Sequence, residues 1–301
     1  MKSSIIEKAK KIIENKHYEA EREALSNKEE ALKDPEFKKL YLAYINNIIE
    51  SAKTGEENPE EEKKLKKAVE KRLKELKLGS VEPEYYCQKC KDNGLTHDGK
   101  YCDCFIDEVN KLLKAESGFL ELEDFENTKL DIFEANSQMK TLYAKMQQWC
   151  NSNFAKTIVY LGGETGVGKT HLIKCMANEL IKRHKLVLLT TSFAMHQDFV
   201  RSFSTRDAEE KQNIISKYID AEILFIDDLG TELRNPNVTV NYLYQVLNER
   251  KMKKRPTIIT SNLTLADINE YYDERISSRI ADQSQSICVY IQGEDLRHKK
   301  F

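Results

Sequence analysis

Apolar side chains in the first 80 residues recur at helical spacing. Between residues 37 and 49 they return every three or four positions, which describes one continuous face of an α-helix. Shorter stretches with the same spacing span residues 5–13 and 65–76. The glycine and proline within residues 54–59 interrupt the pattern, because both residue types break helices. We therefore expect three amphipathic helices that form a small bundle, a partner-binding surface, or both.

From about residue 136 the pattern changes to short apolar runs that alternate with helical stretches. The four runs are rich in β-branched side chains and span residues 157–161, 186–190, 223–226 and 257–260. Nearly continuous apolar strands that alternate with helices are typical of a parallel sheet covered by helices on both faces. The sequence therefore predicts an α/β fold for this half of the chain.

These patterns divide the chain into three parts. We expect a helical region at residues 1–115 with a cysteine-rich knuckle at residues 85–105, a linker at residues 116–135, and the α/β domain at residues 136–301. With 40% hydrophobic and 33% charged residues, the chain has enough apolar surface for a core and the polarity of a soluble protein.

Charge and hydropathy limit the possible partners. The formal net charge of −2 gives no overall attraction for nucleic acid, so any DNA contact must come from a local patch. The first 30 residues are rich in lysine and glutamate and do not resemble a signal peptide. No apolar run approaches the ~20 residues that a membrane span needs. We expect a cytoplasmic protein with no membrane partner.

Four of the seven cysteines crowd into the knuckle. Cys87-x₂-Cys90 is a common half of a zinc site, and Cys102-x-Cys104 supplies two more thiolates after eleven intervening residues. Four thiolates suffice for tetrahedral Zn²⁺, although the tight second spacing lets His97 replace one of that pair. A reducing compartment favours a metal site over disulfides. Redox-active thiols and a metal-free knuckle are the alternatives.

The other three cysteines are scattered along the α/β domain. Cys175 lies on a predicted helix and Cys288 in a predicted strand, where buried cysteines with a purely structural role are common. Cys150 is equally isolated. We expect these cysteines to be structural.

A glycine-rich segment follows the first predicted strand and opens a helix, which is the placement that a phosphate-binding P-loop requires. Its residues are Gly163, Glu164, Thr165, Gly166, Val167, Gly168, Lys169 and Thr170. The glycines let successive backbone N–H groups face the phosphates, aided by the helix N-terminus. We expect Lys169 to reach the β- and γ-phosphates of ATP and the Thr170 hydroxyl to ligate Mg²⁺. A simple glycine turn is the structural alternative.

Two carboxylates and an amide follow later strands. Asp227 and Asp228 end the apolar run at 223–226, which is a Walker B pattern. Asp227 would hold the magnesium shell through water, and Asp228 would polarise the attacking water. Most proteins of this class carry glutamate at the second position, so the shorter aspartate predicts slow or partner-dependent hydrolysis. Asn262, in Thr-Ser-Asn after the next strand, resembles a sensor 1 that faces the γ-phosphate or the water.

Two arginines four residues apart lie on one face of a later helix. Arg275 and Arg279, in D-E-R-I-S-S-R-I, resemble the motif in which AAA+ initiators present an arginine finger to the neighbouring subunit's ATP. The resemblance implies Arg279 as the finger and Arg275 as a supporting contact. An arginine held in trans supplies transition-state charge only when subunits assemble. A surface helix with two solvated arginines is the alternative.

These four motifs, in this order, resemble the DnaC/DnaI helicase loaders and the IstB transposition ATPase, which belong to the DnaA-like branch of AAA+ P-loop proteins. The resemblance covers roughly residues 125–301 and implies an AAA+ domain. Only 22 residues follow Arg279, too few for the usual helical lid, and the loaders also lack a lid. Their sensor 2 arginine is carried near the C-terminus, where Arg297 is the matching position; a solvated tail arginine is the alternative.

The helical region and zinc knuckle resemble the DnaI-type loaders, whose N-terminal domain grips the replicative helicase. The resemblance implies an ATP-dependent loader of the hexameric replicative helicase whose AAA+ domains self-associate. Two other functions remain open. One is an IstB-like ATPase that assists DNA transposition, and the other is a zinc-stabilised adaptor in which nucleotide only sets the conformation.

Such loaders are also thought to contact single-stranded DNA. Phe193, Arg201 and Phe203 follow the run at 186–190 and are candidates, because bases stack on aromatic side chains. Core packing explains phenylalanines at this spacing equally well. The basic run at 251–255 is a solvated loop or a phosphate contact.

Overall fold

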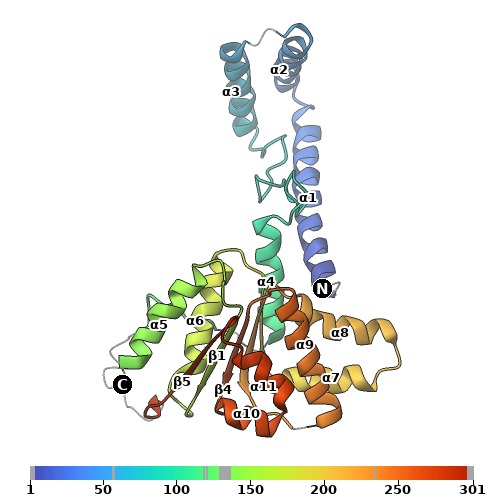
Figure 1. The fold of residues 1–301 in the computed structure, drawn as a ribbon. Coiled ribbons are helices and arrows are strands. Elements are labelled where there is room, and N and C mark those ends of the chain that lie inside the picture. The colour runs from blue at the N-terminus through green and yellow to red at the C-terminus, as the bar shows by residue number, and fades with distance from the viewer. Residues whose placement is uncertain are drawn as a thin grey trace. The chain divides into compact units, whose positions relative to one another are not determined.

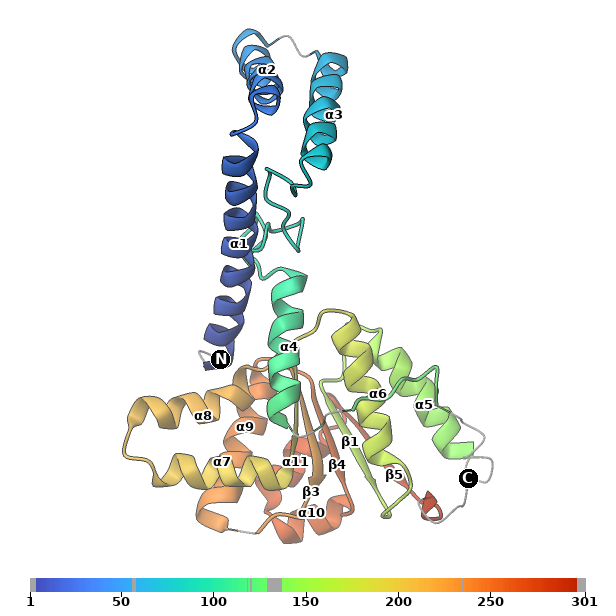
Figure 2. The ribbon, with the colours of Figure 1, turned by 180° about the vertical axis from the view of Figure 1, so that it is seen from behind.

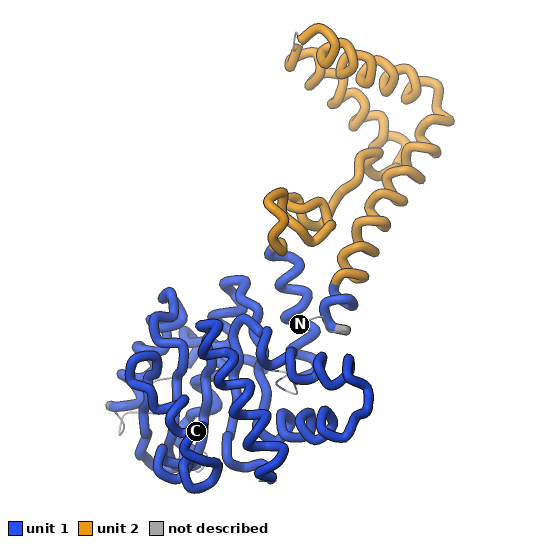
Figure 3. The backbone as a smooth tube through the Cα atoms, turned by 45° about the vertical axis from the view of Figure 1, so that its right-hand side comes forward, with its two compact units in different colours: residues 1–9, 103–301 blue, residues 10–102 orange. Residues whose placement is uncertain are grey.

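The structure, a computed structural model, describes residues 4–55, 58–117, 119, 121–128, 137–233 and 235–296. The chain divides into two compact units (Figure 3). Residues 10–102 form one, which we name the helical unit, and residues 1–9 and 103–301 form the other, the sheet unit.

The three N-terminal helices that the apolar pattern predicts lie in the helical unit, except for the first residues of α1, which belong to the sheet unit. These are α1 (Ser4–Ala31), α2 (Pro35–Thr54) and α3 (Pro59–Glu75) (Figure 1). Helices α2 and α3 both begin with a proline behind a side-chain cap, Asp34 and Asn58 respectively, as the preferences for helix N-termini predict. Their facing sides, together with Ala31 at the end of α1, enclose a small apolar core that includes Phe37, Tyr44, Val69 and Leu73.

The sheet unit contains five parallel strands in the order β2-β3-β4-β1-β5. They are β1 (Ile158–Gly163), β2 (Val187–Thr191), β3 (Ile223–Leu229), β4 (Thr257–Ser261) and β5 (Ser286–Ile291). Strands β1 and β3 consist almost entirely of buried residues, as both-face burial requires. The predicted α/β class with a parallel sheet is confirmed.

Helices cover both faces of this sheet. They are α4 (Asp103–Ser117), α5 (Ser137–Cys150), α6 (Lys169–Lys182), α7 (Ser192–Ser204), α8 (Ala208–Asp220), α9 (Asn241–Met252), α10 (Leu265–Tyr271) and α11 (Glu274–Ala281), with a π-helical turn at Pro236–Val240. Helices α5 and α6 lie on one face, whereas α9 and α11 lie on the other (Figures 1 and 2). Within the described residues, no helix combines the length and apolarity needed to cross a bilayer.

Helix α4 packs along the edge strand β2. The Asn110 side chain donates to the Lys185 carbonyl at 2.8 Å and accepts from the Val187 N–H at 3.1 Å. Asn110 thereby pairs with the strand edge as a neighbouring strand would. This packing places α4 in the sheet unit, so the compact units divide at residue 102, whereas the sequence predicted a domain boundary near residue 115.

Arg250 of α9 is fully buried in the sheet unit. Its guanidinium donates to the carbonyls of Tyr218 and Ala221 at 2.7 Å, to that of Pro256 at 2.6 Å, and to the Thr257 hydroxyl at 2.9 Å. The carbonyls lie at the end of α8 and just before β4. One arginine therefore pairs with backbone carbonyls at the end of a helix and the start of a strand, which would otherwise be buried without a donor.

The isolated cysteines have unequal environments. Cys150 and Cys175 are buried as expected, and burial raises the pKa of the Cys175 thiol to about 11. Cys288 is exposed, so its predicted burial is wrong. The physical reason is that β5 is an edge strand whose side chains alternate between the core and solvent.

Candidate functional site

The loop between β1 and α6 has the backbone geometry of a phosphate-binding turn. Gly163, Gly166 and Gly168 have φ of 152°, 82° and 98°, a region that favours glycine. A Cβ on Gly163 would lie 2.4 Å from the backbone carbonyl oxygen of Ile291, so a side chain is excluded there by contact as well as by conformation. The predicted glycines are therefore needed for the loop to adopt this path.

Lys169 begins helix α6 and is buried beside this loop. Its Nζ donates to the carbonyls of Gly163 and Glu164, both at 2.7 Å, and to Asn262 Oδ1 at 2.9 Å. A lysine ammonium has three donors, and these contacts use all of them. The bond to Asn262 brings together the P-loop and the end of β4, two segments that the sequence predicted to share one site.

Asp227 of β3 is buried next to the P-loop. Its Oδ1 accepts from the Thr170 hydroxyl at 3.2 Å and from the Thr260 hydroxyl at 2.5 Å. Burial raises the pKa of the Asp227 carboxyl. Hydroxyl and carboxylate oxygens are the donors that Mg²⁺ prefers, so these residues fit a magnesium ion. The bond from Thr260 was not predicted. In the Thr-Ser-Asn segment, only Asn262 was expected to have a role.

Asp228 follows in a left-handed backbone conformation, with φ of 55°. Its N–H donates to the Thr260 hydroxyl at 2.9 Å, and its carbonyl accepts from the Ser192 hydroxyl at 2.7 Å. The pairing of β3 with β4 shifts register between Ile226 and Leu229. A bulge at this point re-aims the side chain, and Asp228 lines the cavity next to the P-loop.

This cavity has a volume of about 270 Å³. Its lining residues are Thr165, Gly166, Gly168, Lys169, Thr170, His171, Asp228 and Asn262. Among them only His171 was missed by the sequence analysis. Its Nδ1 is 2.8 Å from the Tyr143 hydroxyl, and burial lowers the pKa of its imidazole. The position of His171 could have identified it, because side chains in the first turn of the helix that follows a phosphate loop border that loop.

The two predicted arginines lie on α11 and do not line this cavity. Arg279 Nε donates to Asn248 Oδ1 at 3.0 Å, whereas Arg275 Nε donates to Asp273 Oδ2 at 2.9 Å. Arg297 lies outside the described residues. The chain just before it reaches the P-loop, because the Leu296 N–H donates to the Gly166 carbonyl at 3.0 Å.

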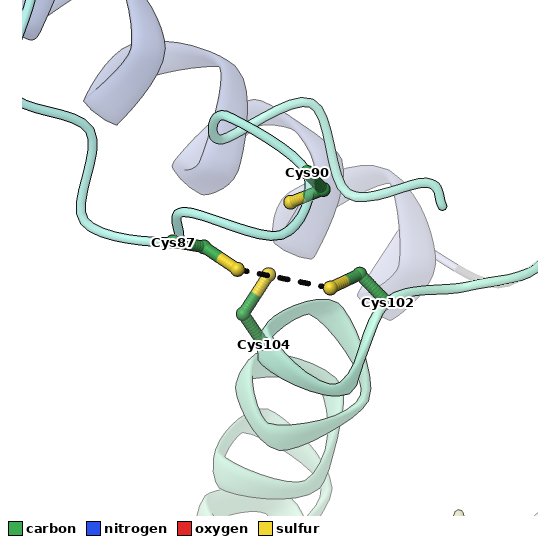
Figure 4. A group of neighbouring side chains, drawn as sticks. All are labelled: Cys87, Cys90, Cys102 and Cys104. Atoms are coloured by element: carbon green, nitrogen blue, oxygen red, sulfur yellow. Dashed lines mark hydrogen bonds between the residues drawn. The ribbon is translucent and has the colours of Figure 1, made fainter. Parts of the chain in front are cut away.

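The four knuckle cysteines converge on one point (Figure 4). The sulfurs of Cys87, Cys90, Cys102 and Cys104 all lie within 4.8 Å of one another. Cys87 Sγ and Cys102 Sγ are 3.7 Å apart, and a tetrahedral zinc ion with Zn–S bonds of about 2.3 Å separates its sulfurs by about 3.8 Å. His97 is 98% exposed and lies outside the group. The donor set therefore fits Zn²⁺ without the histidine.

Asp92 shapes the loop that carries the first cysteine. Its carboxylate is buried and accepts from the N–H groups of Tyr86 at 2.8 Å and of Cys87 at 2.7 Å. A carboxylate that holds the backbone of a metal ligand fixes that ligand's orientation. Asp92 was not predicted, because a carboxylate that binds only backbone N–H groups has no ligand spacing in the sequence.

A parallel sheet with this P-loop, the adjacent strand-end carboxylates and Asn262 beside the P-loop lysine defines an ATP-binding domain of the AAA+ class. The family of IstB-like ATP binding proteins matches residues 119–301, which is more than half of the chain. The chain belongs to this family.

Curated relatives extend beyond the ATP-binding domain. The phage-like element PBSX protein XkdC of Bacillus subtilis is 27% identical over 270 residues, which cover 78% of this chain and 97% of the relative. The replicative helicase loader DnaC of Buchnera aphidicola subsp. Schizaphis graminum is 28% identical over 222 residues, covering 70% and 87%. DnaC of Escherichia coli K12 is 29% identical over 161 residues, covering 52% and 62%.

Solved structures with a similar fold are more distant. A crystal structure of DnaI is 22% identical, with a TM-score of 0.45, and the match covers 58% of this chain and 90% of the other. Domain III of the Thermotoga maritima replication initiation protein DnaA is also 22% identical, with a TM-score of 0.48, covering 58% and 69%. The fold class therefore rests on the sheet and loops of this chain.

Proposed function

We propose that this protein is an ATP-dependent loader of the replicative hexameric DNA helicase in the initiation of DNA replication. The observation that carries the proposal is an assembled P-loop site in a chain whose relatives include proteins named replicative helicase loader DnaC. Membership of the IstB-like family does not by itself distinguish a helicase loader from a transposition ATPase. The similarity to the helicase loader DnaC, which covers 70% of this chain, favours the loader.

ATP binds at the P-loop and is hydrolysed there. Thr170 and Asp227 hold Mg²⁺, which when bound neutralises phosphate charge. Lys169 exchanges its carbonyl contacts for the β- and γ-phosphates, since an ammonium prefers a charged acceptor to a neutral one. Asp228 lines the same cavity and accepts a proton from the attacking water, and Asn262 orients that water.

Hydrolysis depends on assembly. Arg279 and Arg275 do not line the cavity of their own subunit, which supports a role for them at the nucleotide of a neighbour. Arg279 is the finger, and Arg275 supports it. A guanidinium supplied in trans stabilises transition-state charge only in the assembled state, which makes turnover slow in the isolated protein.

The N-terminal part binds the helicase. Zinc held by Cys87, Cys90, Cys102 and Cys104 fixes the fold of the knuckle, as closed four-cysteine sites do in other proteins. The helical unit also exposes Leu42 and Ile49 on α2, seven residues apart and therefore on one face. Exposed apolar side chains of this size are a common component of protein–protein contacts.

Helix α7 is the proposed contact for single-stranded DNA. Phe193, Val200 and Phe203 are 52%, 40% and 58% exposed, so core packing does not account for the two phenylalanines. Exposed aromatic side chains stack on bases. Arg201 pairs with Glu210 at 2.5 Å and would have to leave that carboxylate to meet a phosphate. Lys251 and Arg255 of the basic run likewise pair, with Asp282 and Asp220.

The decisive experiment tests the full chain with the replicative helicase of its own host. The two purified proteins are mixed with ATP or ADP and analysed by size-exclusion chromatography with light scattering. Unwinding of DNA annealed to a closed single-stranded circle is then followed with and without the protein. We expect a stable complex and loader-dependent unwinding that Lys169→Ala abolishes.

Other outcomes point elsewhere. No helicase complex, together with ATP-dependent assembly on duplex DNA, would replace the loader by a transposition ATPase. A helicase complex without any ATP turnover, even with DNA present, would leave a zinc-stabilised adaptor whose nucleotide only sets the conformation.

A further inference from the structure

Both arginines of α11 pack on one aromatic ring. The guanidinium carbon of Arg275 is 5.0 Å from the ring centre of Tyr244, and that of Arg279 is 5.3 Å from it. Tyr244 lies on α9, one of the helices on the same face of the sheet as α11. Cations at this distance over an aromatic face are attracted by its quadrupole. One ring therefore contacts two like charges.

Arg279 has two further anchors on α9. Its Nε donates to Asn248 Oδ1 at 3.0 Å, and its Nη2 donates to the Tyr244 hydroxyl at 3.2 Å. Residues 244 and 248 are one helical turn apart, so both anchors come from a single face of α9. A third, longer bond runs from Nη1 to the Ser278 hydroxyl at 3.5 Å. A guanidinium has five N–H donors in a rigid fork, so these three bonds leave donors for an anionic acceptor.

Arg275 is fixed in a different way. Its Nε and Nη2 donate to Asp273 Oδ2 at 2.9 Å and 2.7 Å. The other Asp273 oxygen caps α11 through the Ile276 N–H at 2.9 Å. Arg275 is therefore paired with a negatively charged carboxylate. The anchors on Arg279, an amide and a phenol, are uncharged. Among the residues that the structure describes, no carboxylate pairs with Arg279, so its charge is the one available to an outside phosphate.

We propose that Tyr244 and Asn248 are positioning residues that hold Arg279 in the orientation in which it meets the ATP of a neighbouring subunit. This inference rests on the proposed role of Arg279 in trans. A long arginine side chain loses much rotamer freedom when it is fixed, and anchors present before assembly remove that cost from the catalytic step. The anchors act on the turnover rate of the assembly and leave nucleotide binding within one subunit unchanged.

The first test is spectroscopic and needs no turnover. The Arg279 Nε–H signal is assigned in a ¹H–¹⁵N spectrum of the full chain by its loss in Arg279→Lys. A ring close to a proton displaces its chemical shift. We expect the signal to move and broaden in Tyr244→Leu and Asn248→Ala, and to keep its shift in Tyr244→Phe. The exposed neighbour Gln245 supplies the control, Gln245→Ala.

The second test measures ATP turnover with helicase and DNA. We expect Tyr244→Leu to lower kcat roughly three- to tenfold with KM unchanged. Tyr244→Phe keeps the ring and should retain most of the rate. In an Arg279→Ala background, Tyr244→Leu should cost nothing further, because a positioning residue acts only through the group that it positions.

The outcomes separate the two claims. If Arg279→Ala leaves assembled turnover intact, the proposed trans role of this arginine fails. If Arg279→Ala lowers turnover but Tyr244→Leu does not, or if Tyr244→Leu slows the Arg279→Ala protein equally, Tyr244 is only packing between helices and the inference is overturned. Equal loss in Tyr244→Phe and Tyr244→Leu would also overturn the role of the ring.

Discussion

Asp228 joins a chemical role to an unusual backbone conformation. Its φ of 55° places it in the left-handed region, which most side chains avoid and which aspartate and asparagine tolerate best after glycine. Two hydrogen bonds hold this conformation: the Asp228 N–H donates to the Thr260 hydroxyl near the end of β4, and the Asp228 carbonyl accepts from the Ser192 hydroxyl at the start of α7. The residue types acceptable at this position are therefore limited by the turn as well as by catalysis.

This double constraint predicts that two inactive variants will differ in stability. Asp228→Asn keeps a side chain that tolerates the left-handed region, whereas Asp228→Ala costs about 1 kcal/mol for a plain Cβ there. We expect both variants to lose ATP turnover at least 100-fold, because the proton acceptor is gone. Only Asp228→Ala should show a lower midpoint of thermal unfolding. Equal midpoints would mean that backbone strain at Asp228 does not matter.

At the scale of secondary structure, the junction of α4 with β2 depends on one side chain. We predict that Asn110→Ala lowers the free energy of unfolding of the sheet unit by about 1–3 kcal/mol, because it leaves a buried N–H and a carbonyl of the edge strand unpaired. The exposed neighbour Lys111 offers the matched control, Lys111→Ala, with a change of at most about 0.5 kcal/mol. Urea unfolding followed by circular dichroism compares them. Matching midpoints would contradict the pairing.

The sequence predicted the features whose pattern lies within a few neighbouring residues and missed those that join distant parts of the chain. The strands and the P-loop were predicted because apolar runs and glycine spacing are contained within a few residues. Lys169 and Asn262 were each expected to face the γ-phosphate, and their direct hydrogen bond is consistent with parallel strands that end at the same edge of a sheet. The pairing of Asn110 with Val187 joins residues 77 positions apart and leaves no trace in the local pattern. The burial of Arg250 was missed for the same reason, because the backbone carbonyls that accept its hydrogen bonds lie at the ends of other elements.

The candidate zinc site was predicted in kind but not in detail. Spacing identified the four cysteines, but it left His97 as a substitute, because spacing alone does not place side chains in space. The structure brings the four sulfurs together and leaves His97 in solvent. The supporting carboxylate of Asp92 had no ligand signature, and its role became apparent only from its hydrogen bonds.

For the whole molecule, we predict that the purified protein carries one zinc ion per chain. Removal of the metal by a chelator should open residues 85–105 to proteolysis, since four closely placed thiolates repel one another without a cation. Cys102→Ser should lose the metal. Cys288→Ser, an exposed cysteine outside the group, should keep it. Elemental analysis and limited proteolysis measure both effects, and a metal content near zero in the unmodified protein would contradict the site.

The pairing of Asn110 with the edge of β2 also bears on aggregation. An edge strand offers unpaired N–H and carbonyl groups to any passing strand, and this is a common route to aggregation. Here a side chain of the same polypeptide occupies such groups at one edge of the sheet. Chain cleavage that releases α4 would uncover that edge. Proteolytic fragments that begin after residue 117 should therefore be less soluble than the full-length protein, even though they retain the whole nucleotide site.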